Sequence, residues 1–391
     1  MTKTKEILKK NTMVIALVVV MVLFQVLISA AGKGSLFAPA NITNLILQNS
    51  YVVILAVGML LCILTGGNID LSVGSVVALV GAIAGVMIVN NKMNVYLTIA
   101  VCLIMGILIG AWQGFWIAYV RIPAFIVTLA GMMLWRGLAL IVLDGLTISP
   151  FPEDYLKYFS SFLPNTADNK GLVFGVTIAV GAILCAVYVV SQLIERGKKV
   201  QKNYELEPAG MLWGRLAVIC VAAMALSFLL GKNKGIPVVL ILLGVIVLVY
   251  SYYTQNTVPG RYLYAMGGNE KAAKLSGINT NRTLFFAYTN MGFLSAVAAL
   301  VCIARFNSAA PSAGTNYELD AIGACYIGGA SAYGGTGTIG GAVIGAIFMG
   351  VLNNGMSILG IDSNWQRAVK GLVLLAAVVF DVLSKKRSAK A

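Results

Sequence analysis

Residues 64–75 read LTGGNIDLSVGS, a polar interruption between two long apolar runs at residues 42–63 and 73–89. The stretch carries two glycines, an asparagine and Asp70, and a charge at the centre of a lipid-facing helix costs roughly 2.5 to 3.5 kcal/mol. A polar loop at membrane depth is tolerated only where it is packed in protein or lines a water-filled path. The stretch therefore predicts a break between two membrane helices with a structural or functional purpose.

Composition places the chain among polytopic membrane proteins. Of its 391 residues, 59% are hydrophobic and only 11% are charged, which is not typical of a soluble protein of this length. A spanning helix needs about 20 mostly apolar residues. The sequence predicts eleven spans, at residues 14–31, 42–63, 71–90, 97–119, 124–146, 172–193, 214–231, 236–253, 284–304, 340–360 and 366–383.

The distribution of Lys and Arg predicts the orientation, because basic residues are enriched in cytoplasmic loops. With the N-terminus inside, Lys3, Lys5, Lys9, Lys10, the loops at 196–202 and 254–283, and the C-terminal tail with Lys390 all fall on the inner side. Eleven spans would leave that tail outside, so we predict a twelfth, short or broken crossing within residues 319–335. Both termini are then cytoplasmic, and the net charge of +14 suits anionic lipid better than nucleic acid.

The first apolar run could instead be a signal peptide. It is longer than the usual apolar region of about 7 to 15 residues in such peptides. We therefore favour an uncleaved first helix.

Missing residue types exclude most catalytic chemistry. The chain has no histidine, and its six cysteines are scattered singly through apolar spans, where they are expected to be small buried hydrophobic residues. No catalytic triad, zinc motif or phosphate-binding loop of the Walker type is present. We predict no catalytic residue, metal or cofactor, so the energy for any transport must come from an ion gradient or another subunit.

A second glycine-rich stretch, YIGGASAYGGTGTIGG at residues 326–341, resembles the first in outline. Each begins with a Gly-Gly pair and leads into an apolar helix. Two broken helices at corresponding places are typical of transporters whose pathway lies between internal repeats. Alternatively, glycines such as Gly337, Gly341 and Gly345 only let helices pack closely, and both interpretations stay open.

The loop at 254–283 contains PGRYLYAMGGNEKAAKLSGINTNR, which predicts a helix of about two turns. Asn269 suits the N-cap, and Gly277 suits the left-handed position after the helix. An isolated helix this short is marginal in water. Either it is a solvated connector or a cytoplasmic partner supplies a docking surface.

Taken together, GGNIDLSVGS, RYLYAMGGNEKAAKLSGI and ELDAIGACYIGGASAYGGTGTIGGAVIGAIFMGVLNNGMSILGI resemble the permease subunits of bacterial ABC importers for monosaccharides, the ribose, galactose and xylose group. The resemblance implies an all-α, cobalamin-importer-like permease fold in the bacterial cell membrane, present as a homodimer. It also implies an ABC ATP-binding subunit and an external sugar-binding protein as partners.

Under this resemblance, the loop helix is the coupling element that docks into the ATPase, with Ala272, Ala273 and Leu275 as a small apolar face. The implied coupling residues are Gly268, Asn269, Glu270, Ala272, Ala273, Leu275 and Gly277.

The whole chain, 1–391, is expected to be one permease domain with the coupling loop at 254–283. It departs from shorter members of the group at residues 150–235, where an outer loop and an extra helix pair are inserted. This longer form is similar to xylose and multiple-monosaccharide permeases, which favours a xylose-like pentose or hexose substrate.

The candidate residues of the substrate pathway are Asn68, Asp70, Ser72, Asn353 and Asn354. Asp70 could be only the N-cap of the following helix, or it could line the path. Asn353 and Asn354 could make interhelical hydrogen bonds worth about 0.6 kcal/mol each, or contact a hydroxylated substrate. Arg136, inside a predicted span, is expected to anchor structure through carbonyl groups or an acid.

The rival class is a secondary transporter driven by protons or sodium. Proton relays use acids and histidines inside the membrane, whereas here histidine is absent and the acids lie mostly at predicted span ends. A membrane enzyme or scaffold has no catalytic constellation to support it. The coupling-type loop favours the ABC importer.

Overall fold

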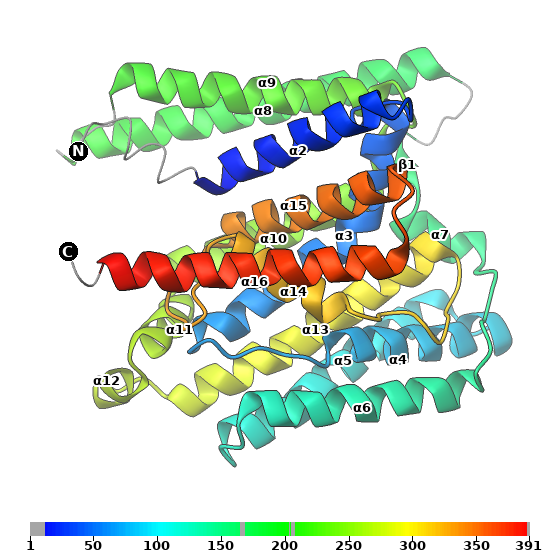
Figure 1. Ribbon diagram of the computed structural model, residues 1–391, viewed down its shortest axis with the longest axis vertical. Coiled ribbons are helices and arrows are strands. Elements are labelled where there is room, and N and C mark those ends of the chain that lie inside the picture. Colours follow the sequence, from blue (N-terminus) through cyan, green and yellow to red (C-terminus); the bar gives the residue numbers. More distant parts are fainter. Residues whose placement is uncertain (1–11, 165–168, 203, 205–207, 389–391) are drawn as a thin grey trace. The chain divides into compact units, whose positions relative to one another are not determined.

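The structure, a computed structural model, describes residues 12–164, 169–202, 204 and 208–388. The expected cytoplasmic positions of residues 1–11, including Lys3, Lys5, Lys9 and Lys10, and of Lys390 lie outside the described residues. The described chain is almost entirely helical (Figure 1).

All eleven predicted spans form helices. They are α2 (Thr12–Ala30), α3 (Pro39–Leu64), α4 (Val73–Gly85) with the π-helical η1 (Val86–Asn90), α5 (Val95–Ala118), α6 (Ala124–Leu143), α8 (Lys170–Gln201), α9 (Ala209–Gly231), α10 (Val238–Asn256), α13 (Thr280–Phe306), α15 (Ile339–Ile358) and α16 (Ser363–Ser388). Among the described residues, ten helices are long and apolar enough to cross a membrane, and α16 is not one of them. An all-helical, polytopic membrane protein is therefore confirmed.

Several short elements were not predicted as spans. They are α7 (Glu153–Phe159), β1 (Phe162–Leu163), β2 (Ile236–Pro237), α11 (Val258–Gly268), α12 (Glu270–Leu275) and α14 (Tyr317–Ile327). The helix α7 follows Pro152 and has Glu153 and Asp154 in its first turn and Lys157 in its last, which are ordinary helix start and stop signals. The two strands pair antiparallel over two residues each.

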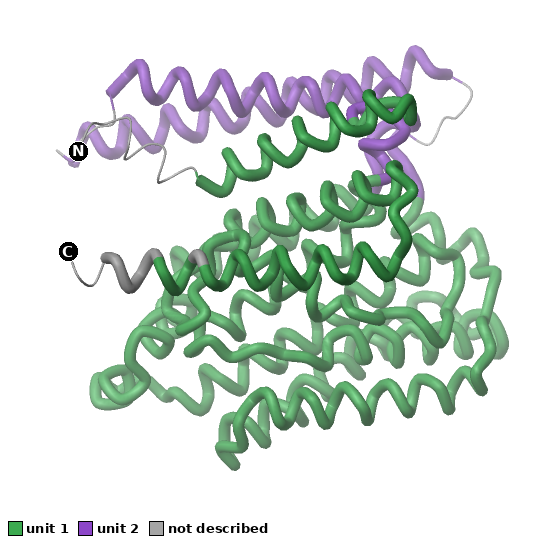
Figure 2. Tube along the Cα trace, viewed as in Figure 1, with its two compact units in different colours: residues 1–36, 45–160, 239–391 green, residues 37–44, 161–238 purple. Residues whose placement is uncertain are grey.

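The chain divides into two compact units (Figure 2). Unit 2 comprises residues 37–44 and 161–238, and unit 1 comprises the rest. Within unit 2, α8 and α9 pack along each other, with the Phe174 and Phe228 rings edge to face at 5.7 Å. Asn233 also donates a hydrogen bond to Thr43 Oγ1 at 2.9 Å.

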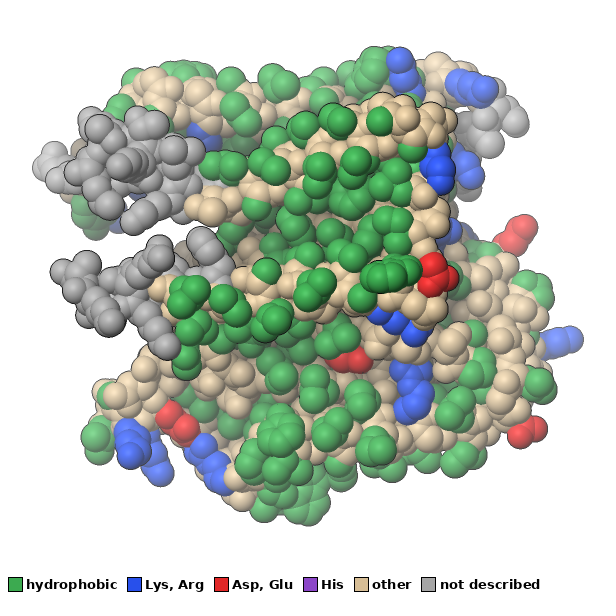
Figure 3. Space-filling view, in the orientation of Figure 1, with side chains coloured by type: hydrophobic (Ala, Val, Ile, Leu, Met, Phe, Trp, Pro, Cys, Tyr) green, Lys and Arg blue, Asp and Glu red, His purple; other side chains and the backbone are tan. Residues whose placement is uncertain are grey.

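The core of unit 1 is built on α3, α4 and α13, which are its most buried long helices. Close backbone approach fixes α13 against α5: a Cβ added to Gly292 would lie 2.2 Å from the carbonyl oxygen of Gly106 and 2.7 Å from Gly110 Cα. Glycines let membrane helices approach closely, which strengthens the van der Waals packing between them. Apolar side chains cover much of the face that α2, α6 and α16 present, and basic side chains gather mainly toward its ends (Figure 3).

The residues in which a short or broken crossing was predicted form α14 and the glycine segment that follows it. After α13 ends, Ala309 and Ile148 exchange two backbone hydrogen bonds of 2.9 Å. The helix α14 then ends at Ile327, and the backbone N–H of Gly335 donates to the carbonyl of Leu64 at 3.1 Å. With 11 residues, α14 is about 16 Å long at 1.5 Å per residue, which is shorter than a full membrane span, and the twelfth crossing stays a prediction.

Of the glycines expected at spacing four, two pack as predicted. Cβ atoms on Gly341 and Gly345 would lie 2.2 Å and 1.9 Å from the carbonyl oxygens of Gly328 and Ala324. Gly337 differs, because it precedes the start of α15 and has φ of +147°. The close-packing interpretation thus applies to the helix, and Gly337 belongs to the glycine segment.

Four of the six cysteines are buried as expected, and Cys185 and Cys220 are half-buried. All six are free thiols. They pack as small hydrophobic residues, in keeping with their scatter along the sequence.

Candidate functional site

The two glycine-rich stretches lie in direct backbone contact. A Cβ on Gly67 would be 2.1 Å from the carbonyl oxygen of Ala332, and one on Gly334 would be 2.5 Å from Gly66 Cα. Gly66, Gly67 and Gly334 also have positive φ, a conformation that glycine adopts without steric cost. Both the spacing and the backbone conformation therefore require glycine here.

The end of α11, in the loop at 254–283, lies against both glycine-rich stretches. A Cβ on Gly267 would lie 1.9 Å from the carbonyl oxygen of Leu64 and 2.3 Å from the nitrogen of Gly335. The hydroxyl of Tyr264 donates to the carbonyl of Gly337 at 3.0 Å. We call residues 64–67, 267–268 and 334–337 the glycine junction. It joins the loop at 254–283 to both breaks through backbone atoms.

Sequence reasoning missed this junction, although the sequence holds a signal for it. Gly-Gly pairs occur at 66–67, 267–268 and 334–335, one in each of the three segments that meet. The pairs at 66–67 and 334–335 have positive φ at both residues.

The predicted loop helix is present as α12. The Asn269 side chain accepts a hydrogen bond from the backbone N–H of Ala272 at 3.0 Å, and Gly277 follows the helix with φ of +85°. Arg121 holds the helix to the body of unit 1, since its guanidinium pairs with Glu270 at 2.6 Å and donates to Thr280 at 3.2 Å. Glu270 therefore has a partner in its own chain.

The expected apolar face of α12 is divided. Ala273 is buried, whereas Ala272 is exposed and Leu275 has 90% of its surface exposed. Residues three apart share a face of a helix and adjacent ones do not, so Ala273 points into unit 1 while Ala272 and Leu275 point away. Gly268 is also exposed, with nothing within 4 Å of an added Cβ.

Residues 65–72 run back along α3 before α4 begins. The backbone N–H of Asp70 lies 3.4 Å from the sulfur of Met59, which is five residues before the end of α3. Asp70 is 3% exposed, and its Oδ1 accepts hydrogen bonds from the Ser72 backbone N–H at 2.8 Å and the Ser72 hydroxyl at 2.6 Å. Gln113 of α5 donates to that hydroxyl at 2.7 Å. The N-cap of α4 is Ser72, so the N-cap role predicted for Asp70 is wrong, and Asp70 is instead a local acceptor in the loop just before the helix.

The remaining pathway candidates lie apart from this cluster. Asn68 donates only to Thr65 in its own loop, at 3.2 Å and 3.4 Å. Asn353 and Asn354 lie on α15 beyond Gly350, which packs against Asn49 of α3. Asn49 is ten residues from Met59, or about 15 Å along the helix. The structure therefore brings Asp70 and Ser72 together, and places Asn353 and Asn354 at another depth.

Arg136 of α6 has partners of the expected kind. Its guanidinium donates to the carbonyls of Pro311 at 3.3 Å and Ala313 at 2.5 Å. It thereby holds the loop between α13 and α14.

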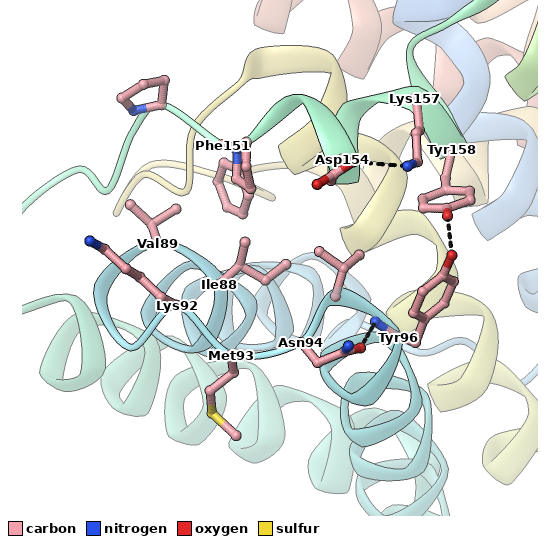
Figure 4. Close-up of a pocket in the computed structure, with 13 residues that line it drawn as sticks. Ile88, Val89, Lys92, Met93, Asn94, Tyr96, Phe151, Asp154, Lys157 and Tyr158 are labelled. Carbon is pink, nitrogen blue, oxygen red and sulfur yellow. Dashed lines mark hydrogen bonds and ion pairs between the residues drawn. The ribbon is translucent and has the colours of Figure 1, made fainter.

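A separate cavity of about 630 Å³ lies between α7 and the start of α5 (Figure 4). The hydroxyls of Tyr96 and Tyr158 lie 2.5 Å apart at one side, and Lys157 pairs with Asp154 at 2.9 Å. The Lys157 hydrogen bond lowers the pKa of the Asp154 carboxyl and raises the pKa of Lys157 itself. Tyr96, Asp154 and Lys157 are exposed and Tyr158 is half-buried, and the four side chains pair with one another, so the cavity has the character of an open surface.

We predict that Asp70→Asn keeps transport and Asp70→Ala weakens it. Asn retains an oxygen that accepts the Ser72 N–H, whereas Ala removes it at a cost of about 0.5 to 2 kcal/mol. Uptake normalised to membrane abundance, with abundance measured separately, checks this. Equal loss of uptake in both variants at normal abundance would show instead that the negative charge of Asp70 acts in the path.

Comparison with known proteins gives consistent results along nearly the whole chain. The family model described as "Branched-chain amino acid transport system / permease component" matches residues 41–378. A xylose transport system permease protein of Haemophilus influenzae is 37% identical over 388 residues, covering 99% of this chain and all of that protein. A ribose import permease protein of Escherichia coli is 35% identical over 378 residues, covering 97% and 95%. No solved structure shows a significant match.

Proposed function

This chain belongs to the family described as the branched-chain amino acid transport system permease component, and from that premise we propose that it is the membrane subunit of an ATP-driven monosaccharide importer. Similarity to xylose and ribose permeases over nearly the full length supports a sugar as substrate. The slightly higher identity to the xylose permeases favours a xylose-like pentose.

The close backbone contacts of the glycine junction support a mechanism for this transport. An importer of this kind must convert events at a cytoplasmic ATPase into opening of a membrane path. Here Gly267, eight residues from Leu275, contacts both polar breaks of the bundle through backbone atoms. A displacement of α12 would therefore reach residues 64–67 and 334–337 without crossing a flexible linker.

The proposed partners follow from the same mechanism. An ABC ATP-binding subunit would dock on α12 and carry out ATP hydrolysis, while an external sugar-binding protein would deliver the substrate. Two copies of the permease would enclose the path, and the candidate residues for lining it are Asn68, Asp70, Ser72, Asn353 and Asn354. The exposed apolar faces of α2 and α6 would contact lipid.

We further propose twelve crossings, a cobalamin-importer-like fold and cytoplasmic termini. The helix α16 ends on the same side of unit 1 as α12 (Figure 1), which supports a C-terminus on the coupling-loop side. Single cysteines at Ser161 and Ser388 in a Cys-free background test this with an impermeant maleimide. We expect only Ser161→Cys to react in intact cells and both to react after permeabilisation. Labelling of Ser388→Cys in intact cells would contradict the orientation.

Reconstitution tests the function itself. The permease, co-purified with its ATPase, is placed in vesicles with the sugar-binding protein, and uptake of labelled xylose and ribose is measured. We expect uptake that requires ATP and the binding protein, with xylose preferred. Uptake that follows an imposed proton or sodium gradient without ATP would assign the chain to secondary transporters.

A further inference from the structure

A partly buried ion pair joins α14 to α16. Lys370 Nζ lies 2.8 Å from Asp320 Oδ1, and their side chains are only 20% and 3% exposed. The Tyr51 hydroxyl of α3 donates to the other carboxylate oxygen at 3.0 Å, and the Tyr51 ring stacks on Tyr317 at 3.8 Å. Ionisable groups within a membrane bundle are costly and are commonly functional.

A second contact joins α16 to the glycine segment that follows α14. The backbone N–H of Ala332, in the glycine segment after α14, donates to Asp381 of α16 at 3.4 Å. Lys370 and Asp381 are eleven residues apart, about three turns of helix. The helix α16 therefore lies along both α14 and the glycine segment, and contacts each through a charged side chain.

Residues on both sides of α14 have left-handed backbone conformations. Gly314 and Asn316 before it, and Gly329 after it, have positive φ. The helix has 11 residues, whereas its neighbours in sequence, α13 and α15, have 27 and 20. A short helix between such segments can shift as a rigid body, together with the start of α15 on which it packs.

The segments before and after α14 each contact another part of unit 1. Arg136 holds the preceding loop by its carbonyls, and the segment after α14 enters the glycine junction through Gly335. A displacement of Gly267 would thus reach α14 only through the segment that follows it. α14 is also held by close backbone contact with α15 at Gly345 and by the Tyr51 hydrogen bond from α3, and the Lys370 ion pair is the charged contact that joins it to α16.

We propose that Lys370 is a positioning residue whose ion pair with Asp320 latches α14 against α16, and that this latch must release for the path to open. The proposal rests on the proposed function, since the release is driven through the coupling loop. With the latch closed, α14 and the glycine segment hold the path in one state. When α12 moves, the glycine junction shifts, the pair separates and α14 swings about its glycine ends.

Cross-linking tests whether α14 must leave α16. A Cβ on Gly323 of α14 would lie 3.9 Å from Leu374 Cδ1 of α16, so the two positions face each other; Gly323→Cys with Leu374→Cys in a Cys-free background is oxidised, and a mobility shift that reduction reverses verifies the disulfide. We expect oxidation to reduce sugar uptake by a factor on the order of ten or more, as for other couplings between sites, and reduction to restore it. The reduced protein is the matched control. Full uptake by the oxidised protein would overturn the latch.

Charge variants test Lys370 itself. We expect Lys370→Met to raise ATP hydrolysis without sugar and to lower its stimulation by the sugar-loaded binding protein, because the latch no longer holds the resting state. Lys370→Arg should preserve the stimulation. Since an unpaired Asp320 could impair folding, Lys370→Met with Asp320→Asn removes both charges. Uncoupled hydrolysis in this double variant at a normal melting temperature supports the latch, whereas wild-type stimulation contradicts it.

Different results would contradict the proposed function and the latch. If the unmodified complex shows no sugar-stimulated ATP hydrolysis, the proposed function is wrong. If the unmodified complex responds and the oxidised and charge variants respond equally, only the latch is wrong.

Discussion

Leu275→Asp is expected to abolish sugar-stimulated ATP hydrolysis while the permease still reaches the membrane. Leu275 has 90% of its surface exposed at the end of α12, a capped helix tied to the body of unit 1 by the Arg121–Glu270 pair. A leucine so exposed on a docking helix is suited to an apolar site on the ATPase. An aspartate there would bury an unpaired carboxylate, a penalty of several kcal/mol that the interface could not offset.

The measurements are co-purification of the ATPase subunit and hydrolysis in reconstituted vesicles. The matched control is Leu146→Asp, the same exchange at a loop leucine that is 67% exposed and lies on the side predicted to be external. We expect the control to bind the ATPase normally. If Leu275→Asp does so as well and still responds to the sugar-loaded binding protein, α12 is not the coupling element.

Glu270→Lys is expected to weaken coupling for a reason internal to the permease. It would place a lysine against Arg121 in place of the present 2.6 Å ion pair, so α12 would lose its attachment and transmit force less well. The pair is exposed, and exposed pairs contribute little to stability. We therefore expect lower stimulation of hydrolysis with an unchanged melting temperature, and a lower melting temperature would instead indicate a role in folding.

Gly267→Ala is expected to cause the second largest loss, in transport and in stability together. The new methyl would lie 1.9 Å from the Leu64 carbonyl oxygen and 2.3 Å from the Gly335 nitrogen. Both are backbone atoms that cannot rotate aside, and overpacking of this kind costs about 1 to 3 kcal/mol or more. The glycine junction must open to admit the methyl, which disturbs both polar breaks.

Uptake per permease in the membrane and the melting temperature in detergent measure this effect. Gly340→Ala is the matched control, because an added Cβ there has nothing within 4 Å. We expect Gly340→Ala to behave as the wild type. Normal uptake and melting in Gly267→Ala would show that the junction is looser than the described contacts and does not transmit movement.

The sequence alone determined where the long helices lie, although some of their ends differ, as in α8, which was predicted at 172–193 and extends over Lys170–Gln201. Apolar length predicts membrane helices because the bilayer sets the number of residues needed, and all eleven segments are helical. The cap at Asn269 and the left-handed Gly277 were also predictable, because capping depends on side chains within a few residues of the helix end. The helix α7 carried equally local signals, beginning after Pro152.

Only the tertiary structure decided which of these segments meet. Gly267 lies 203 residues from Leu64, and Lys370 lies 50 residues from Asp320. Helical periodicity reports which face of one helix is apolar and carries no record of a partner so far away in the chain. Glu270 and Leu275 illustrate the result: both were predicted to face a partner subunit, and the fold turns Glu270 toward Arg121 of its own chain. The glycine pairs show that the backbone can approach closely, while the packing of α3, α11 and the segment after α14 determines what it approaches.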